Sequence, residues 1–446
     1  MPSRLINYED KKNPEQNLQN RIIRVAILAE EPLGWGSGKH FFSIILQNYA
    51  WVINNKTYTF QVKNIFDKDI VKGRLNTSEF DVLLVPGGGV GDGQAIMKGF
   101  IFSNKVKKWK KTISTFIKNG GGYVGICGGA ALLTDLTNGE KKLRSFLERQ
   151  YHKSSLGVSC VSSYYKSIAL PIFYPFQKKH PEKIGAIAYV FSFAPGETTD
   201  GVRIHSGGVP LDFKLSKDHP IFSDFDKDTE RIRWWGGPAL MLPEKPDRFV
   251  KVLAKYTTQE QTDNNIQIHA WRYTGGIHGL IVAFLRALRY IKKEKVSLKN
   301  VFLYTFYMAG DWELTDGSIE LDYSEKPSIT AEIYPNTNAG RILLCTSHPE
   351  YMVWWKGHIT EMKKTNFTCL GTGLHKWEDI EPLSQNVTDE LTHTWWMVRR
   401  FVAWAAKVPD DHLPPIQKEV IADKDKSILI KNVFWDGSLQ NQMENI

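Results

Sequence analysis

The chain has 446 residues, of which 42% are hydrophobic and 24% are charged, and its formal net charge is +9. This ordinary globular composition argues against disorder and allows one large domain with insertions. No apolar run of about 18 residues occurs, so we expect no membrane-spanning segment. The four cysteines include no Cys-x-x-Cys pair and no apolar signal segment opens the chain, which favours free thiols in a reducing cytoplasm.

The first third of the chain alternates between predicted strands and helices. Apolar runs predict strands over 22–29, 58–65, 80–85 and 123–126, and amphipathic or small-residue patterns predict helices over 39–52, 103–118 and 128–136. This alternation implies a parallel sheet with helices on both faces. The lysines of segment 105–111 fall opposite an apolar helix face. We interpret them as a solvated surface and expect no nucleic-acid partner.

The rest of the chain is less regular. Strand-like runs at 185–192 and 249–256 precede an amphipathic helix at 279–292. A strand at 341–345 resumes the sheet pattern, and 387–407 reads as a long helix that carries three tryptophans. We find no internal repeat.

The segment Gly125-Ile126-Cys127-Gly128-Gly129 joins a short buried strand to a helix of small residues. This pattern is typical of a nucleophile elbow, in which a sharp turn presents a strained nucleophile. At a helix N-terminus, amide groups and the helix dipole favour a Cys127 thiolate, and the Gly128 amide is positioned to stabilise an oxyanion. The alternative is a buried structural cysteine in a tight turn.

Two further segments follow predicted strands. In Thr346-Ser347-His348-Pro349-Glu350, His348 is a candidate general base and acid, and Glu350 is a candidate to hold its other nitrogen. In Pro86-Gly87-Gly88-Gly89, the backbone can approach a ligand closely and supply a second oxyanion amide. Taken singly, each segment is also compatible with an ordinary loop.

The segment Trp234-Trp235-Gly236-Gly237-Pro238 has two interpretations. Adjacent tryptophans on a strand face opposite ways, so one belongs to the core and the other is exposed. Plain core packing is one interpretation, and pocket lining is the other. The candidate pocket residues are Gly89, Trp235, Gly236 and Gly237.

Together, these motifs resemble the class I glutamine amidotransferase-like superfamily. The resemblance rests on the turn at 86–88, the elbow at 125–129 and the Ser-His-Pro-Glu segment at 347–350, which follow the superfamily's order. Within it, the chain is most similar to biotin–protein ligase N-terminal-like domains, which carry stretches like 121–130, 218–222 and 234–238. The catalytic ligase half, with its Gly-Arg-Gly-type loop, is absent. We therefore reject biotin ligase activity.

The resemblance implies a fold and a domain organisation. We expect an α/β fold with a flavodoxin-like parallel sheet, helices on both faces, and a large mixed α/β insertion between the nucleophile and the His-Glu pair. The expected segments are a flexible N-terminus at 1–20, the amidotransferase-like domain at 21–370 with an inserted region at about 140–335, and a C-terminal helix and tail at 371–446 that pack on the domain.

The resemblance also implies a chemistry. Cys127, His348 and Glu350 would form a triad, with Gly88 and Gly128 as oxyanion donors, and would cleave an amide or related carbonyl through a thioester. Glutamine-hydrolysing members carry a glutamine four residues after the cysteine, where this chain has Ala131. Glutamine is therefore not the expected substrate. We expect a small molecule or a peptide end, with no cofactor and no metal.

Several alternatives stay open. The chain is either a hydrolase-like enzyme or a catalytically idle binding or regulatory module that kept the fold. A redox or glyoxal-type activity ranks last, because the strand–elbow segment lacks the acidic residue that such enzymes place near the cysteine. The sequence specifies neither a partner synthetase that would receive ammonia nor an oligomeric state.

Overall fold

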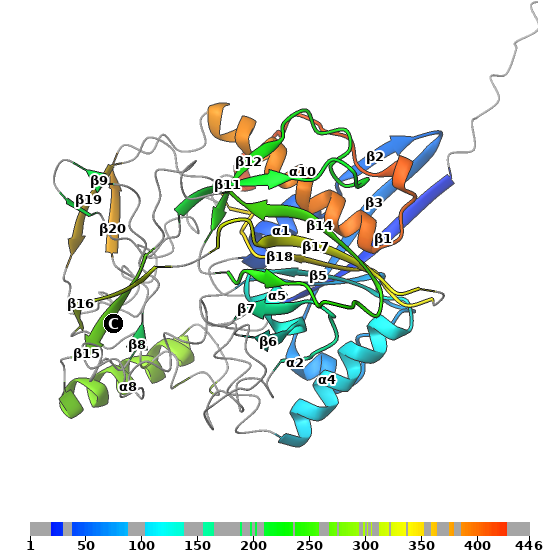
Figure 1. Ribbon diagram of the computed structural model, residues 1–446. Helices are drawn as coiled ribbons and strands as arrows, with labels where there is room; N and C mark the ends of the chain where they lie inside the picture. The colour runs from blue at the N-terminus through cyan, green and yellow to red at the C-terminus, as the bar shows by residue number, and fades with distance from the viewer. Residues whose placement is uncertain are drawn as a thin grey trace, which may run out of the picture.

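The computed structural model of the chain describes most of the predicted parallel region and parts of the remainder (Figure 1). The described residues are 19–29, 38–87, 103–137, 155–164, 188–189, 197–198, 201–202, 209–234, 237–257, 267–273, 276–293, 312–320, 323–335, 338–351, 358–363, 374–378 and 385–425, with the single positions 298, 301 and 305.

A 10-stranded sheet forms the centre of the fold. Its strands are β1 (Gln19–Leu28), β2 (Ala50–Ile53), β3 (Lys56–Ile65), β4 (Val82–Val85), β5 (Gly122–Ile126), β11 (Val209–Leu215), β12 (Thr229–Trp234), β14 (Phe249–Tyr256), β17 (Pro327–Ile333) and β18 (Ile342–Cys345). Their order is β12-β11-β14-β17-β18-β5-β4-β1-β3-β2. The central strands β3, β1, β4, β5 and β18 run parallel. Antiparallel strands extend the sheet on both sides.

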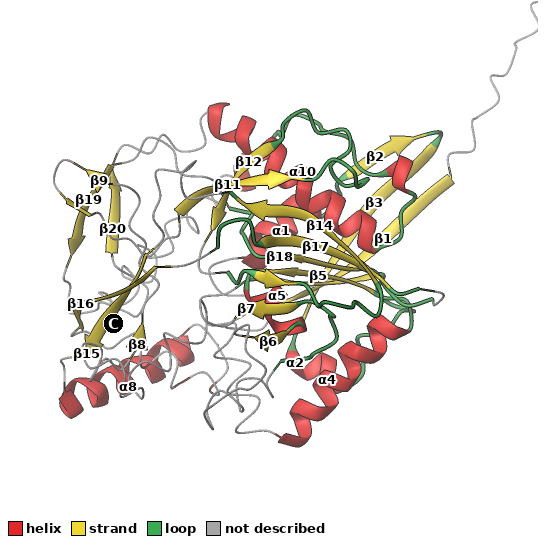
Figure 2. Cartoon of the chain, viewed as in Figure 1, coloured by secondary structure: helices red, strands yellow, loops and turns green. Residues whose placement is uncertain are grey.

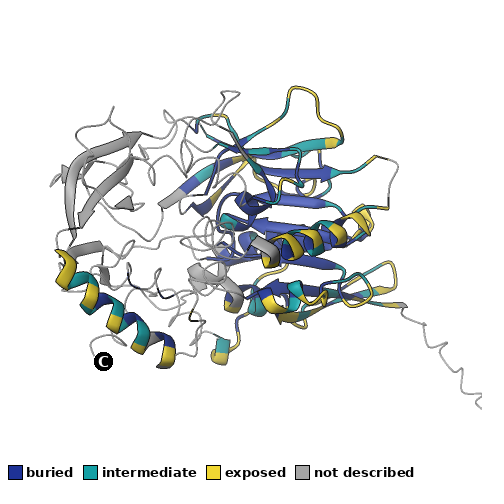
Figure 3. Cartoon of the chain, turned by 90° about the horizontal axis from the view of Figure 1, so that it is seen from below, coloured by how far each residue is buried: buried dark blue, intermediate teal, exposed yellow. Residues whose placement is uncertain are grey.

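Helices cover both faces of this sheet, as the alternating pattern predicted (Figures 1 and 2). The helices α1 (Gly38–Leu46) and α10 (Gln385–Ala405) lie on one face. On the other lie α4 (Ser103–Lys118) and α5 (Gly128–Leu133), with α2 (Asp67–Val71) beside α4. Side chains alternate along β1 accordingly, so that Val25 packs in the α1–α10 core and Ala26 in the α4 core. Figure 3 shows the central strands buried between the layers.

Two predicted helices end earlier than the sequence pattern indicated. The helix expected over 39–52 ends at Leu46, and residues 50–53 form β2 instead. Asn48 adopts a φ of 62°, which turns the chain back toward β3. Trp51 then stacks on Tyr58 of β3 with ring centroids 5.1 Å apart, so tertiary packing overrides the helical pattern. The helix expected over 128–136 gives way to the strand at 135–137 for a similar reason, because that strand pairs with 162–164.

The described part of the inserted region extends the main sheet. Four strands of this region, β11, β12, β14 and β17, are strands of the 10-stranded sheet. The smaller elements are β6 (Asp135–Thr137), β7 (Ser162–Tyr164), β8 (Ala188–Tyr189), β9 (Glu197–Thr198), β10 (Gly201–Val202), β13 (Leu240–Met241), β15 (Gln267–Tyr273), α8 (Gly276–Lys293), β16 (Trp312–Glu320), β19 (His358–Lys363), β20 (Leu374–Glu378) and the 3-10 turn Asp410–His412. The expected domain boundaries stay predictions. Within the described residues, no helix combines membrane-spanning length with the required hydrophobicity.

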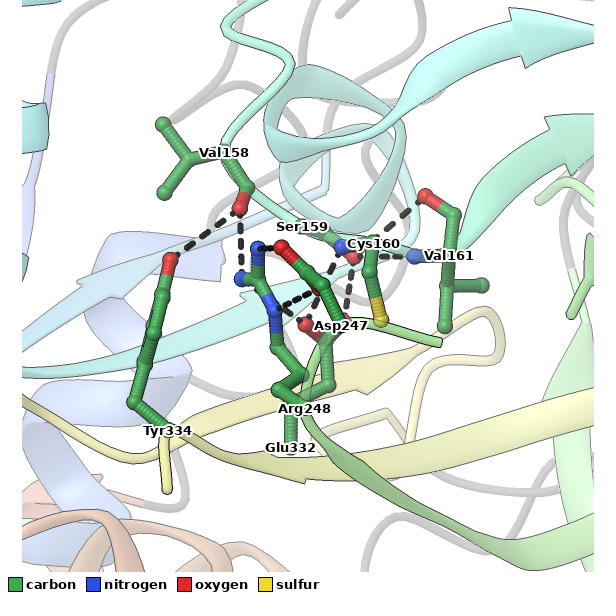
Figure 4. A network of polar contacts seen from close by, with 8 residues as sticks. All are labelled: Val158, Ser159, Cys160, Val161, Asp247, Arg248, Glu332 and Tyr334. Atoms are coloured by element: carbon green, nitrogen blue, oxygen red, sulfur yellow. Dashed lines mark hydrogen bonds and ion pairs between the residues drawn. The ribbon is translucent and has the colours of Figure 1, made fainter. Parts of the chain in front are cut away.

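Figure 4 shows a polar network that ties the residues around Ser159 to the main sheet. Glu332 of β17 is fully buried and accepts hydrogen bonds from the Ser159 hydroxyl and from the Cys160 N–H, the latter at 3.2 Å. The Arg248 guanidinium lies 3.5 Å from Glu332 and donates to the Val158 carbonyl at 2.8 Å. Burial raises the pKa of Glu332, against these contacts, which lower it. The network therefore surrounds a buried carboxyl group, and its hydrogen bonds and the nearby guanidinium partly offset the cost of burial.

Candidate active site

Cys127 directly follows β5 and caps α5, with φ 49° and ψ −107°. A positive φ is uncommon for a residue with a Cβ, and such strained positions cost about 1–3 kcal/mol and gather at functional sites. The Cys127 N–H donates to the Cys345 carbonyl at 2.7 Å, and its own carbonyl accepts the Ala130 N–H at 3.0 Å. A Cβ at Gly129 would lie 2.1 Å from the Val85 carbonyl oxygen, which explains the small residue after the turn. The strand–turn–helix geometry of an elbow is therefore present.

His348 and Glu350 lie just beyond the neighbouring strand, β18. The Nδ1 atom of His348 is 2.8 Å from Oε1 of Glu350, and both side chains are buried. The His348 N–H donates to the Arg233 carbonyl at 2.7 Å, and Trp395 Nε1 of α10 donates to the Glu350 carbonyl at 3.1 Å. Because β5 and β18 pair in parallel, their carboxyl ends bring Cys127 and His348 to the same edge of the sheet.

Cys127 and His348 contact one another through their side chains, which form a hydrogen bond. Since Nδ1 faces Glu350, Nε2 is the imidazole nitrogen left for the cysteine. Gly87 permits this approach. A Cβ at Gly87 would lie 2.8 Å from Cβ of Cys127, 2.5 Å from Cε1 of His348 and 3.2 Å from its Nε2. Hence any side chain at position 87 would displace one of the two partners.

The electrostatics of the pair favour a cationic imidazole. Burial lowers the pKa of His348, but the charges of Glu350 and Cys127, and hydrogen bonds to both, outweigh burial and raise it to about 10. At neutral pH the folded protein therefore holds an imidazolium beside Cys127. The arrangement can supply a nucleophile and a proton donor together.

Aromatic contacts position the imidazole from a second side. The Tyr351 ring stacks on His348 with centroids 5.0 Å apart and 21° between the planes. Phe41 of α1 meets the same ring edge-on at 5.1 Å, and the Arg233 guanidinium lies 5.5 Å from its centroid. Tyr351 thus joins His348 to the end of β12.

The loop that carries His348 rests on a second set of buried groups. A Cβ at Gly237 would lie 1.7 Å from the Thr346 carbonyl oxygen, so only glycine permits this approach. The Gly237 carbonyl accepts bonds from Trp234 Nε1 and from the Tyr323 hydroxyl, both at 3.1 Å. The Tyr256 hydroxyl lies 2.7 Å from the Thr346 hydroxyl. These contacts fix the backbone just before His348.

The structure brings together Cys127, His348, Glu350 and Gly128, the last as the half-buried first residue of α5. Gly237 lies beneath the His348 loop, and Trp234 is the core member of the tryptophan pair. The predicted site residues Gly88, Gly89, Trp235 and Gly236 lie outside the described residues.

Sequence reasoning did not single out Tyr351, Arg233 or Gly87 as separate members of the site. Tyr351 follows Glu350 directly and Arg233 precedes Trp234, so proximity to the motifs was the available signal. Their contacts with His348 depend on strand pairing across the sheet, and a sequence pattern does not reveal such pairing.

The other described cysteines differ from Cys127. Burial raises the pKa of Cys345 to about 12, and burial with the charge of Glu332 raises that of Cys160 to about 12 as well. Both thiols are therefore protonated and unreactive near neutral pH. Among the described residues, no cluster of three His, Cys, Asp or Glu side chains is arranged to hold a metal ion.

Comparisons with known proteins give only distant similarity. Neither known protein families nor curated proteins match the chain. Among solved structures, a ThuA-like protein from Bacteroides uniformis aligns over 77% of this chain and 86% of its own, with 11% sequence identity and a TM-score of 0.29.

Proposed function

We propose that the chain is a cysteine-nucleophile enzyme of the class I glutamine amidotransferase-like superfamily that cleaves an amide or related carbonyl through a thioester. The observation that carries this proposal is the continuous contact from Cys127 through His348 to Glu350. The strand order supports the flavodoxin-like fold, because the parallel strands β3-β1-β4-β5-β18 stand second, first, third, fourth and fifth along the chain.

The geometry supports a two-step reaction. The Cys127 sulfur attacks the substrate carbonyl carbon, and the oxyanion that forms is stabilised by the Gly128 N–H, which has no helical partner at the first turn of α5. The His348 imidazolium gives its proton to the leaving nitrogen as the bond to carbon breaks. Neutral His348 then takes a proton from water, whose oxygen attacks the thioester and releases the acid and the Cys127 thiolate.

Two features limit the range of possible substrates. Ala131 is buried in the position where a glutamine would hold the substrate, and its N–H bonds the Cys127 carbonyl at 3.1 Å, so glutamine is not the proposed substrate. Cys127 is only 6% exposed and His348 only 3%. Such restricted access fits a small molecule or the end of a peptide.

Alkylation tests the proposal. Iodoacetamide is added to the folded protein between about pH 5 and 9, and modified cysteines are located by mass spectrometry of peptides. We expect Cys127 to react well below pH 8.5, the rough value for a free thiol. We expect Cys160 and Cys345 to stay unmodified. A Cys127→Ser variant should also lose turnover on a panel of anilides and thioesters.

The opposite result would favour the idle binding module. If Cys127 reacts only at the pH of an ordinary thiol, and Cys127→Ser leaves every activity unchanged, the enzymatic proposal fails. His348→Gln provides the matched comparison, because it removes the imidazolium and retains a polar side chain of similar size. Its Cys127 should react more slowly at pH 7 than that of the wild type.

A further inference from the structure

Helix α8 carries a row of exposed apolar side chains, Ile277, Ile281 and Leu285, called here the α8 stripe. They are 80%, 54% and 52% exposed and follow one another at intervals of four residues. Residues spaced by four lie on the same side of a helix, so the three side chains adjoin one another. Figure 3 shows exposed residues along α8, at the edge of the molecule. Single exposed apolar residues are ordinary, whereas a contiguous row marks an interaction surface.

The opposite side of α8 is fixed against protein. Ala283, Ala287 and Ile291 are again four residues apart, and all three are buried. Ala283 and Ala287 each stand two residues after a member of the α8 stripe, which is about 200° around the helix. The packing of α8 therefore holds the stripe on its outward side.

Positive charge accompanies the α8 stripe. Arg289 continues the four-residue spacing beyond Leu285, Lys292 lies in the next turn, and both are exposed. The sequence of α8 contains four basic residues and no acidic residue. A second copy of this helix would bring no carboxylate to pair with these cations. The outward side of α8 is thus complementary to a surface that is both apolar and anionic.

An anionic phospholipid surface combines these two properties. Aliphatic side chains of an interfacial helix enter the boundary between headgroups and acyl chains to a depth of about 5–10 Å, and anionic headgroups attract Lys and Arg. A stable protein interface buries about 800 Å² on each partner, which is more than three aliphatic side chains supply. A bilayer has no such requirement, because lipids rearrange around a narrow stripe.

We infer that α8 docks the protein on the surface of an anionic phospholipid membrane. The α8 stripe enters the boundary with the acyl chains, and Arg289 and Lys292 contact the headgroups. None of these residues belongs to the contact between Cys127 and His348, so the inference goes beyond the proposed function and fails or succeeds independently of it.

Vesicle flotation with the full-length protein tests the inference. The vesicles consist of phosphatidylcholine alone or of equal parts phosphatidylcholine and phosphatidylserine, and the partition coefficient is measured at about 0.1 M salt, where the Debye length is about 10 Å. We expect it to be at least about tenfold higher with phosphatidylserine, because two cations lie at the headgroups. At about 1 M salt most of this difference should disappear.

The contribution of the α8 stripe is measured with a matched pair of variants. Ile281→Ser is compared with Ile22→Ser, because Ile22 of β1 is the same residue type and is 58% exposed. Ile281→Ser should lower the partition coefficient by about tenfold, since it removes apolar area that the membrane buries. Ile22→Ser should bind like wild type. Ile281→Trp should bind more tightly than wild type, because tryptophan favours the membrane interface, and a gain in binding does not follow from a loss of folded protein.

The contribution of charge has its own control. Arg289→Gln combined with Lys292→Gln should remove most of the preference for phosphatidylserine. Lys107→Gln combined with Lys111→Gln removes the same charge from exposed positions of α4 and should keep that preference.

Three results would overturn the inference. The first is a wild-type protein that does not bind phosphatidylserine vesicles. The second is an equal loss of binding in Ile281→Ser and Ile22→Ser, or in the α8 and α4 charge variants. The third is self-association of the wild type that Ile281→Ser abolishes, seen by analytical ultracentrifugation without vesicle binding, which would assign the stripe to a second copy of the chain.

Discussion

Nδ1 of His348 lies 2.8 Å from Oε1 of Glu350, two residues further along the chain, and neither side chain is more than 3% exposed. This contact orients the imidazole so that its other nitrogen faces Cys127. The contact also places the negative charge of Glu350 beside the imidazole, where this charge stabilises the protonated form of His348.

Replacement of Glu350 by glutamine tests the contribution of its charge. The variant keeps the shape and a hydrogen-bond acceptor, but loses the charge that raises the pKa of His348. We expect a lower His348 pKa and a Cys127 alkylation rate at pH 7 reduced by at least about tenfold, as when an orienting carboxylate is removed from a triad. Imidazole NMR titration and alkylation kinetics measure the two effects.

The matched control is Glu230→Gln, because Glu230 lies 3.3 Å from His393 in a second Glu–His pair. This variant should alkylate at the wild-type rate. Equal rates in Glu350→Gln and wild type would show that the Glu350 charge does not act on Cys127.

The raised pKa of His348 predicts how stability depends on pH. Folding lifts this pKa from 6.5 to about 10, so between those values the folded protein binds a proton that the unfolded chain releases. The stabilisation from this proton is therefore complete below about pH 6.5 and is lost as the pH rises toward 10, and the slope reaches about 1.4 kcal/mol per pH unit above about pH 8.5, where the Cys127 thiol of the unfolded chain has ionised as well. Urea denaturation of wild type and His348→Gln at several pH values measures this slope, and parallel profiles would contradict the prediction.

Gly87→Ala should separate Cys127 from His348. The added Cβ would lie 2.5 Å from Cε1 of His348 and 2.8 Å from Cβ of Cys127, so one side chain must move. We expect the rate of Cys127 alkylation at pH 7 to fall by about tenfold or more, because misplacement of about 1 Å can cost about a hundredfold.

Gly73→Ala distinguishes this effect from general strain. Gly73 has a φ of 76° with nothing within 4 Å of an added Cβ, so alanine there is strained and remote from the site. It should lower the free energy of unfolding by about 1 kcal/mol and leave Cys127 reactivity unchanged. If both variants lose reactivity to the same extent, the close approach at Gly87 is not the cause.

The network in Figure 4 predicts a stability effect with no direct effect on Cys127. Arg248→Ala leaves the buried Glu332 carboxylate without its nearby cation, and removing one member of a buried pair typically costs about 3–5 kcal/mol. The comparison is Arg74, whose side chain is 62% exposed in its pair with Asp69, and Arg74→Ala should cost less than about 1 kcal/mol. Urea denaturation measures both losses, and similar values for the two variants would contradict the buried-charge argument.

Much of the fold followed from local patterns. The strand at 249–256 and the helix at 103–118 match their predicted ranges, because an apolar periodicity reports directly on a buried face. The helix predicted over 39–52 was too long, since Trp51 gains more by stacking on Tyr58 in β2–β3 pairing than by extending α1. Sequence periodicity does not describe such competition between distant segments.

The candidate site residues Cys127, His348 and Glu350 could be predicted from the sequence by itself, because the turn at Cys127 and the His348–Glu350 contact are local features of short motifs. Tertiary structure decided their surroundings. Parallel pairing of β5 with β18 brings the two motifs to one edge, and the bridge to His348 brings Arg233 beside them. The effects of burial and charge on His348 likewise arise from groups far apart in the chain, so they exist only once the sheet has formed.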